Sequence, residues 1–385
     1  MKRRRQAGAF VMTACLLGMA SGAFADVFVP KENGGYWNQA ATWSKAEGDS
    51  ARTYPQHPYD TAAFTNNLGD SGYSIRMPDW GAWGCSKLVF YARPNYWTPV
   101  DVVTYYNKNG TMVFQSTNGP AVIHARNGTK INLGYRWESN GILTMQLKSD
   151  LLVTNDAVRD VVVTVGSTEG HYADARFTDD GTPHDIVVNA CAQKKLTMSL
   201  KSSISTFRGT WYVIGPKTTL EVQASGSLGD AANPIVLRDG GNVALWAYAR
   251  TLTRRLEGSG NVTAVVLTNG VAGVISPGEN GVGTLNITAD TSMLGGAGVV
   301  EVDLADNSTY DVVNFTGDLE LGGALVVTTL GDYSPEIRQK WPVMTATGTI
   351  AGAFDSITKG FDVSVEAGSV MLRRSPPSGS TIIIQ

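Results

Sequence analysis

Short runs of β-forming residues alternate with turn residues throughout segment 206–241, and this pattern restricts the fold more than any other feature of the chain. Runs of three to five β-branched, aromatic or other apolar residues predict strands at 211–214, 218–222 and 235–237. Gly, Pro, Asn, Asp and Ser residues between these runs mark turns. Turns that recur about every ten residues, with no helical period between them, indicate all-β structure.

The same pattern extends toward the N-terminus of the chain. Further strands are predicted at 111–114, 121–124, 130–133, 142–147, 160–165 and 185–188. Alternation along a strand puts Leu143, Met145 and Leu147 on the inner face. Segment 143–149 (LTMQLKS) recurs 53 residues later as 196–202 (LTMSLKS). With roughly 18–27 residues in each coil of a solenoid, this spacing predicts two or three coils.

A single elongated repeat domain accounts for the length of the chain. A chain of 385 residues would otherwise suggest two or three compact domains, whereas each coil of a solenoid packs only on its neighbours. We therefore predict an all-β fold, a right-handed parallel β-helix (a solenoid) with an N-terminal cap, in which Trp37 and Trp43 close the first coil. The predicted divisions are a signal peptide (1–25), the cap and first coils (26–105), the parallel β-helix (106–334), a C-terminal β cap (335–375) and a disordered tail (376–385).

The first residues have the pattern of a secretory signal peptide. Four basic residues at 2–5 precede an apolar core at 7–19, and Ala23-Phe24-Ala25 forms a small-x-small cleavage site. The mature chain should therefore begin at Asp26, and the apolar core is too short to predict a membrane span. Cleavage before Cys15, as in a lipoprotein, is the disfavoured alternative because residues 12–14 match that signal poorly.

Charge and cysteine content narrow the classes of partner. Four of the 31 Lys and Arg residues lie in 1–25, so the mature chain has 27 basic against 34 acidic residues, a net charge of −7. This acidic balance argues against binding to nucleic acid or to an anionic membrane. Cys85 and Cys191 remain after cleavage, and an exported protein could pair them. Because positions 106 residues apart lie several coils from each other in a solenoid, we expect two unpaired, mostly buried thiols instead. Neither has metal-ligand spacing, and no cofactor is expected.

Several segments resemble the autotransporter-associated β-strand repeat family, the passenger-type β-helices of bacterial surface proteins. The segments that carry the resemblance are 206–211, 220–234, 256–260, 275–278, 310–311, 321–325 and, near the N-terminus, 37–64. These motifs are structural, so the resemblance implies a β-helix at the cell surface and no particular activity. Full members end in a membrane β-barrel, for which the sequence after the repeat region leaves no room. Self-translocation is therefore not implied.

Two polar clusters are candidate catalytic sites, and each has a simpler structural interpretation. Gly69-Asp70-Ser71-Gly72 is similar to a serine-protease nucleophile loop, but a turn is the simpler interpretation because too little chain precedes it to position a triad. Paired carboxylates could hydrolyse a polysaccharide, and a lyase on the same scaffold could cleave one by elimination. The residues considered for that chemistry are His171, Asp174, Arg176, Asp179, Asp180 and His184. The competing interpretation is a polar turn at 178–183, and we expect no catalytic residues.

Aromatic residues near the N-terminus suggest an alternative binding function. Trp80, Trp83, Tyr96 and Trp97 could form a platform on which sugar rings stack, although packing within the cap is the preferred interpretation. The function predicted from sequence is that of an exported, non-enzymatic surface or extracellular structural protein, adhesin-like, with cell-surface glycans or other surface proteins as partners. A polysaccharide lyase, a glycoside hydrolase and a carbohydrate-binding protein are the alternatives.

Overall fold

The computed structural model describes residues 26–376, apart from positions 33, 49, 66–72, 79–81, 92–99, 105–108, 127–129, 135–140, 157–158, 168–173, 192, 202–204 and 249–250. The predicted signal peptide, and the predicted tail beyond residue 376, lie outside the described residues. The described residues contain β-strands and two short 3-10 helices, η1 (Ala40–Thr42) and η3 (Ser225–Leu228), but no α-helix. The prediction of an all-β protein is therefore confirmed.

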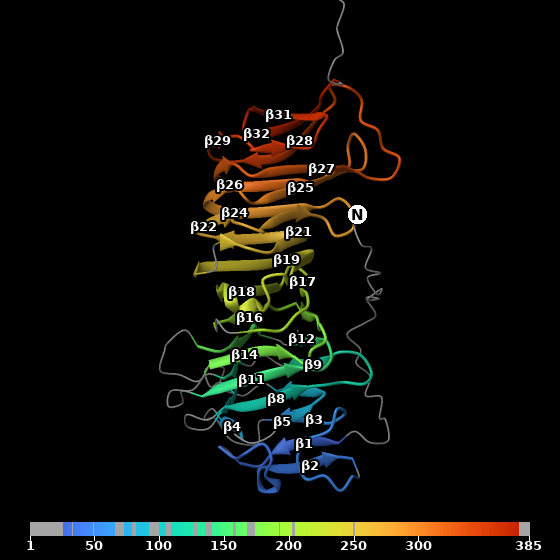
Figure 1. Ribbon diagram of the computed structural model, residues 1–385. Helices are drawn as coiled ribbons and strands as arrows, with labels where there is room; N and C mark the ends of the chain where they lie inside the picture. Colours follow the sequence, from blue (N-terminus) through green and yellow to red (C-terminus); the bar gives the residue numbers. More distant parts are fainter. Residues whose placement is uncertain are drawn as a thin grey trace, which may run out of the picture.

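Most strands form two long parallel stacks, which extend along one column (Figure 1). Stack A consists of β1 (Val27–Pro30), β3 (Thr61–Phe64), β6 (Lys87–Phe90), β9 (Ala121–Ala125), β12 (Leu151–Asn155), β15 (Ile186–Ala190), β17 (Trp211–Ile214), β19 (Ile235–Tyr248), β21 (Arg255–Ala264), β23 (Val274–Pro277), β25 (Val299–Leu304), β27 (Ala324–Thr329) and β30 (Ser356–Ile357). Each strand in this order pairs in parallel with the next.

Stack B runs beside stack A. It consists of β4 (Tyr73–Met77), β7 (Val100–Thr104), β10 (Lys130–Leu133), β13 (Val161–Val165), β16 (Leu196–Leu200), β18 (Thr218–Ala224), the second halves of β19 and β21, β24 (Thr284–Met293), β26 (Val312–Leu321) and β28 (Lys340–Ala346). The long strands β19 and β21 thus belong to stack A by their first halves and to stack B by their second halves.

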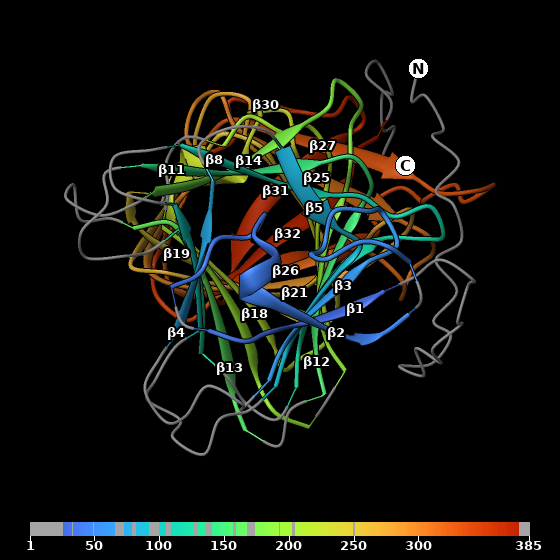
Figure 2. The same ribbon diagram turned by 90° about the horizontal axis from the view of Figure 1, so that it is seen from below.

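Two shorter parallel stacks complete the wall. Stack C consists of β5 (Ala82–Cys85), β8 (Gly110–Phe114), β11 (Ile142–Leu147) and β14 (Asp174–Asp179). Stack D, farther along the chain, consists of β20 (Thr251–Leu252), β22 (Val266–Asn269), the second halves of β24 and β26, and β29 (Ile350–Gly352). Viewed along the column, the strands surround a single interior (Figure 2).

The pairing pattern shows that the chain coils. Parallel neighbours need a long connection between them, and here that connection is the rest of one coil. In the C-terminal half, Ile235 pairs with Trp211, 24 positions earlier, and Val299 pairs with Val274, 25 positions earlier. Other coils are longer, because Ile186 pairs with Leu151, 35 positions earlier, and Ser356 pairs with Ala324, 32 positions earlier. The expected coil of about 18–27 residues is therefore wrong for these longer coils.

The internal sequence echo does not mark equivalent positions of two coils. Segment 143–147 lies in β11 of stack C, whereas segment 196–200 forms β16 of stack B. The interpretation of the echo as a repeat of the coil is wrong. What the two segments share is the alternation of an inward Leu, Met and Leu, and Leu143, Met145 and Leu147 are all fully buried as predicted.

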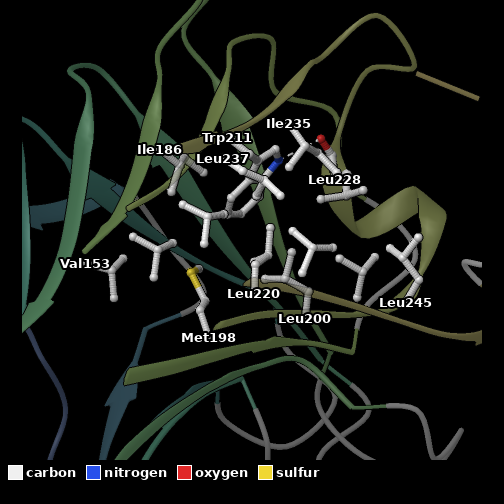
Figure 3. Close-up of a cluster of buried hydrophobic side chains, with 14 of the residues drawn as sticks. Val153, Ile186, Met198, Leu200, Trp211, Leu220, Leu228, Ile235, Leu237 and Leu245 are labelled. Atoms are coloured by element: carbon white, nitrogen blue, oxygen red, sulfur yellow. Dashed lines mark hydrogen bonds between the residues drawn. The ribbon is translucent and has the colours of Figure 1, made fainter. Parts of the chain in front are cut away.

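Inward side chains from all four stacks form one continuous hydrophobic core. The core cluster extends from Phe28 in β1 to Leu372 near the C-terminus. In its middle, Met198, Trp211 and Leu220 lie in one cluster although they come from three different strands (Figure 3). Each stack therefore contributes an apolar inner face, and its outward residues remain available to solvent.

The pairing changes to antiparallel at both ends of the column. β2 (Trp43–Glu47) pairs antiparallel with β1, outside the parallel stack. At the other end, β31 (Phe361–Glu366) and β32 (Ser369–Arg374) form an antiparallel hairpin, and β32 pairs with β28. These antiparallel strands interrupt the parallel coil at the point where an outermost strand would otherwise lack a partner.

Candidate functional site

The acidic cluster considered from sequence does not assemble into one groove. Asp174 and Arg176 lie at the start of β14, where the Asp174 carboxylate accepts the amide of Ala175 and Arg176 Nε donates to Thr144 Oγ1 at 3.1 Å. Asp179 ends the strand and Asp180 lies in the turn that follows. The polar side chains are thus distributed from one end of β14 to the other.

Asp179 and Asp180 stabilise the turn after β14. Asp179 accepts hydrogen bonds from the Arg208 guanidinium (Nε to Oδ2, 3.0 Å), the Arg208 amide (2.9 Å) and the Gly181 amide (2.9 Å). Asp180 accepts from the Thr182 amide at 3.0 Å and lies 3.2 Å from His184 Nε2. The hydrogen bond from Arg208 is the main cause that lowers the pKa of Asp179, and the Thr182 amide is the main cause for Asp180. Both carboxylates are therefore held ionised as turn acceptors.

Most of the other residues that the sequence suggested as functional lie outside the described part of the chain. Gly69-Asp70-Ser71-Gly72, His171, Trp80, Tyr96 and Trp97 lie outside the described residues. Trp83 is half-buried, packs on the core, and meets Tyr54 edge-on at 5.7 Å between ring centroids. Its ring therefore contributes to packing, as the preferred interpretation of the aromatic residues expected.

The two cysteines of the mature chain differ from each other. Cys85 is a free thiol, 1% exposed, as predicted, and burial raises its pKa to about 12. Cys191 is exposed, so the prediction that it is buried is wrong. Because Cys85 is a free thiol, the two residues are not joined to each other.

A group of outward charges lies across the coils of stack A. Arg255 on β21 contacts Glu257 on the same strand and Glu301 on β25, with Arg255 Nη2 2.7 Å from Glu301 Oε2. Ser276, on the strand between them, accepts from Arg255 at 2.8 Å and donates to Glu301 at 3.1 Å. Burial alone would lower the pKa of Arg255, but the hydrogen bonds to Glu301 and Glu257 outweigh it and raise the pKa.

These contacts join neighbouring coils, and we call Arg255, Glu257, Ser276 and Glu301 together the clamp. A hydrolytic pair of carboxyls needs one member that retains a proton to donate to the leaving group. Here one guanidinium lies between two carboxylates and binds both, so each carboxylate is already engaged in an ion pair. The clamp ties three successive coils of stack A together on their outer face.

Replacing Arg255 by methionine should destabilise the fold by about 1–2 kcal/mol, because two partly buried carboxylates would be left without their shared cation. The estimate is below that for a fully buried pair since the Arg255 side chain is 33% exposed. Urea denaturation measures the change. Arg373→Met is the control, since Arg373 pairs with Asp362 at the surface and its loss should leave the midpoint nearly unchanged. Equal shifts for the two variants would contradict the clamp.

Asp311 is a buried carboxyl that also joins coils. It is 1% exposed, and its two oxygens accept the amides of Gly283 (2.7 Å) and Asp303 (2.8 Å). Burial raises the pKa of Asp311 to about 7, although the two amide hydrogen bonds lower it in part. The ordinary pKa of an aspartate is about 3.9. The folded protein therefore holds a proton on Asp311 over a pH range in which the unfolded chain has lost it.

This proton makes the stability depend on pH. A raised pKa in the folded state contributes stability that is fully present below about pH 4 and is lost as the pH rises through about 7. The contribution of Asp311 should fall by up to about 1.4 kcal/mol per pH unit between about pH 5 and 7. Asp311→Asn should remove that slope from the free energy of unfolding. Asp306→Asn in the neighbouring hairpin should retain the wild-type slope, because Asp306 titrates near pH 2. An unchanged slope in Asp311→Asn would refute the assignment.

A row of asparagine side chains lies along the outer face of stack B. Nδ2 of Asn261, Asn286 and Asn314 donates in each case to Oδ1 of the asparagine one coil earlier, at 3.0–3.1 Å. Asn242 begins the row by donating to the carbonyl of Thr218, and Thr345 ends it by donating to Asn314. These residues are register partners on adjacent strands. The ladder therefore fixes the register of five consecutive coils.

A polar depression of about 250 Å³ opens at the start of this ladder. The residues that line it are Lys195, Pro216, Lys217, Thr219, Asn242, Val243, Ala244 and Thr263. Two lysines, two threonine hydroxyls and an amide are suited to a ligand that combines negative charge with hydroxyl groups. Sequence reasoning missed this site because its residues come from four different coils.

No protein-family model matches the chain, and no curated protein was found that matches it in sequence. Within the residues described by the structure, no group of three or more His, Cys, Asp or Glu side chains could hold a metal ion. The same residues include no helix long and apolar enough to cross a membrane.

Proposed function

We propose that the chain is an exported, non-enzymatic surface or extracellular structural protein, adhesin-like, built on a right-handed parallel β-helix. The observation that carries this proposal is the continuous stack of parallel strands from β1 to β30. On its outer face, Arg255 binds Glu257 on its own strand and Glu301 two coils later. A column of this kind offers long faces for contact with other molecules. The resemblance of 206–211, 220–234 and the later segments to the autotransporter-associated repeat supports the same proposal.

The handedness and the N-terminal cap belong to this proposal. Connections between parallel strands of one sheet are right-handed in about 98% of cases, which supports a right-handed coil. The antiparallel β2 and the buried Trp37 and Trp43, whose ring centroids are 5.1 Å apart, support a cap over the first coil. Trp37 Nε1 also donates to the carbonyl of Pro55 at 2.7 Å, which fixes the ring in place.

Export is tested by expression of residues 1–385 in a Gram-negative cell. We expect the chain in the periplasm, at the outer-membrane surface or in the medium, with Asp26 as its first residue. Fractionation followed by N-terminal peptide mass measurement distinguishes the outcomes. A chain that stays in the cytoplasm with Met1 retained would overturn the export proposal.

Binding of an acidic glycan is a second candidate function, and the polar depression over stack B supports it. Its two lysines could pair with carboxylate or sulfate groups, while Thr219, Thr263 and Asn242 supply polar atoms for sugar hydroxyls. A glycan array tests this function, with the double variant Lys195→Met/Lys217→Met as the comparison. Binding of acidic glycans that the double variant loses would favour it, and equal signals from both proteins would remove it. A polysaccharide lyase or glycoside hydrolase is the remaining alternative. It is tested by measuring the release of sugar products from polysaccharides.

A further inference from the structure

The first residue of the proposed mature chain, Asp26, has a buried carboxylate, and its backbone nitrogen lies near a second buried carboxylate, that of Asp60. The side chains of Asp26 and Asp60 are both 0% exposed. The backbone nitrogen of Asp26 lies 3.4 Å from Asp60 Oδ1 and points its hydrogen toward it. The other oxygen of Asp60 accepts the amides of Gln56 (3.1 Å) and His57 (3.0 Å). The nitrogen that a signal peptidase would release is therefore already directed at a fixed, buried acceptor.

Two cations partly neutralise this pair. Arg52 Nη2 lies 2.9 Å from Asp60 Oδ1 and 3.3 Å from Asp26 Oδ2, and Lys45 Nζ lies 3.1 Å from Asp26 Oδ2. Both cations keep contact with solvent, with side chains 18% and 21% exposed. Asp26 Oδ1 is buried and has no hydrogen-bond partner among the described residues. The site thus retains acceptor capacity at the carboxylate of Asp26 itself.

We propose that removal of the signal peptide at Ala25–Asp26 places the new α-ammonium group of Asp26 in a buried ion pair with the Asp60 carboxylate, and that this pair closes the first coil. The inference rests on the proposed export. Hydrolysis adds one water across the peptide bond: the hydroxyl goes to the Ala25 carbonyl carbon, and a hydrogen goes to the Asp26 nitrogen. The amine then takes up a proton and becomes an ammonium group.

An ammonium group suits the site better than the amide of the uncleaved chain. At 3.4 Å the amide contact is long for a hydrogen bond between neutral and charged groups. An ammonium group carries three hydrogens and a full charge, and charge-assisted hydrogen bonds are shorter and about twice as strong as neutral ones. A buried carboxylate that gains an opposite charge at contact distance is stabilised in its ionised form.

Asp26 and Asp60 also take part in the strand pairing of stack A, so removal of the signal peptide affects the first strands of that stack. The carbonyl of Asp26 accepts the amide of Thr61 at 2.9 Å, so Asp26 begins the pairing of β1 with β3. The carbonyl of Asp60 accepts the amides of Ser86 (3.0 Å) and Lys87 (3.3 Å), which begin the pairing with β6. An ion pair between the two residues therefore joins the first strands of stack A at their common end.

The test measures the titration of the Asp26 α-amine in the mature chain. A tag whose protease leaves no extra residue gives a protein that begins at Asp26. Pulse labelling with acetic anhydride across a pH series, followed by mass measurement of the N-terminal peptide, gives the midpoint of amine reactivity. Burial changes the rate of labelling, but the pH midpoint reports the pKa. An ordinary α-amine has a pKa of about 7.7–8.0, and the ion pair should raise the midpoint in the native protein by at least about one unit, which is a tenfold change in proton affinity.

The charged groups around this amine are Asp26, Asp60, Lys45 and Arg52, and the neutral thiol of Cys85 lies near Asp60. The reference is the same chain unfolded in urea, and Asp60→Asn is the matched variant that should return the midpoint to the ordinary range. A raised α-amine pKa contributes stability below about pH 8 that is lost as the pH rises through the raised value. A native midpoint equal to or below that of the unfolded chain would overturn the inference.

A second measurement does not depend on any substitution of Asp60. A chain that retains Gly-Ser before Asp26 cannot form the ammonium group at this position, so it should melt at a lower temperature than the chain that begins at Asp26 at pH 7. Above pH 10 the difference should shrink as the amine loses its proton. Equal melting temperatures at pH 7 would contradict the inference. Both tests use chains with a defined first residue, so failure of export in cells would leave their results unchanged.

Discussion

Replacement of Trp211 by alanine is expected to lower the free energy of unfolding by about 3–5 kcal/mol, the range for loss of a large aromatic side chain from a core. Trp211 is 0% exposed, and its Nε1 donates to the carbonyl of Leu228 at 3.1 Å (Figure 3). Its ring meets Phe177 and Phe207 edge-on, at 6.0 and 5.5 Å between centroids. The substitution would leave a cavity inside the coil, and the Leu228 carbonyl would keep only its hydrogen bond from Asn233 Nδ2.

Trp246→Ala is the control for this prediction. Trp246 lies on β19, in the coil that follows Trp211, but its side chain is 54% exposed. Its loss should change the urea midpoint only slightly, because little apolar area returns to water. Similar losses of stability in the two variants would contradict the placement of Trp211 in the interior. Circular dichroism in a urea series measures both.

Replacement of Gly258 by alanine is expected to cost about 2–5 kcal/mol, for two reasons that add. Gly258 has a φ of +102°, a conformation that strains any residue with a β-carbon. A β-carbon at this position would also collide with the carbonyl oxygen of Leu237, one coil earlier. Gly258 on β21 lies directly against the backbone of β19, so the collision would separate neighbouring strands of stack A.

Gly181→Ala separates the two causes. Gly181 has a φ of +100°, almost the same as that of Gly258, but a β-carbon there would have no atom within 4 Å. Alanine at Gly181 should therefore show only the conformational strain, about 1–2 kcal/mol. If both alanine variants lose the same free energy of unfolding, the collision with the neighbouring coil at Gly258 does not contribute, and the explanation by close packing is wrong. Thermal or urea unfolding followed by circular dichroism gives the comparison.

The class of fold and the inner faces of strands could be predicted from local pattern. Alternation identifies which side of a strand is apolar, and this was sufficient to place Leu143, Met145 and Leu147 in the core. The stack to which a strand belongs could not be predicted, because strands of stacks B and C show the same alternation. For that reason segments 143–147 and 196–200 looked like equivalent positions of a repeat although they are not.

The polar groups that join coils were harder to predict than the core. Arg255, Ser276 and Glu301 are separated by 21 and 25 positions, and only the register of β21, β23 and β25 brings them together. That register depends on turn lengths, which the sequence pattern gives only roughly. For Asp179 and Asp180 the sequence is misleading in the other direction. Their adjacency suggests a catalytic pair of carboxylates, but both accept hydrogen bonds from local backbone amides.

The proposed structural role predicts that this column of coils does no chemistry on polysaccharides. This is tested most directly by incubation of the purified mature chain with a panel of neutral and acidic polysaccharides. Polymer mass, new reducing ends and unsaturated sugar products are measured over time. We predict no change in any polymer relative to a heat-unfolded sample of the same protein. Depolymerisation by the folded chain that the heat-unfolded chain does not reproduce would contradict the claim.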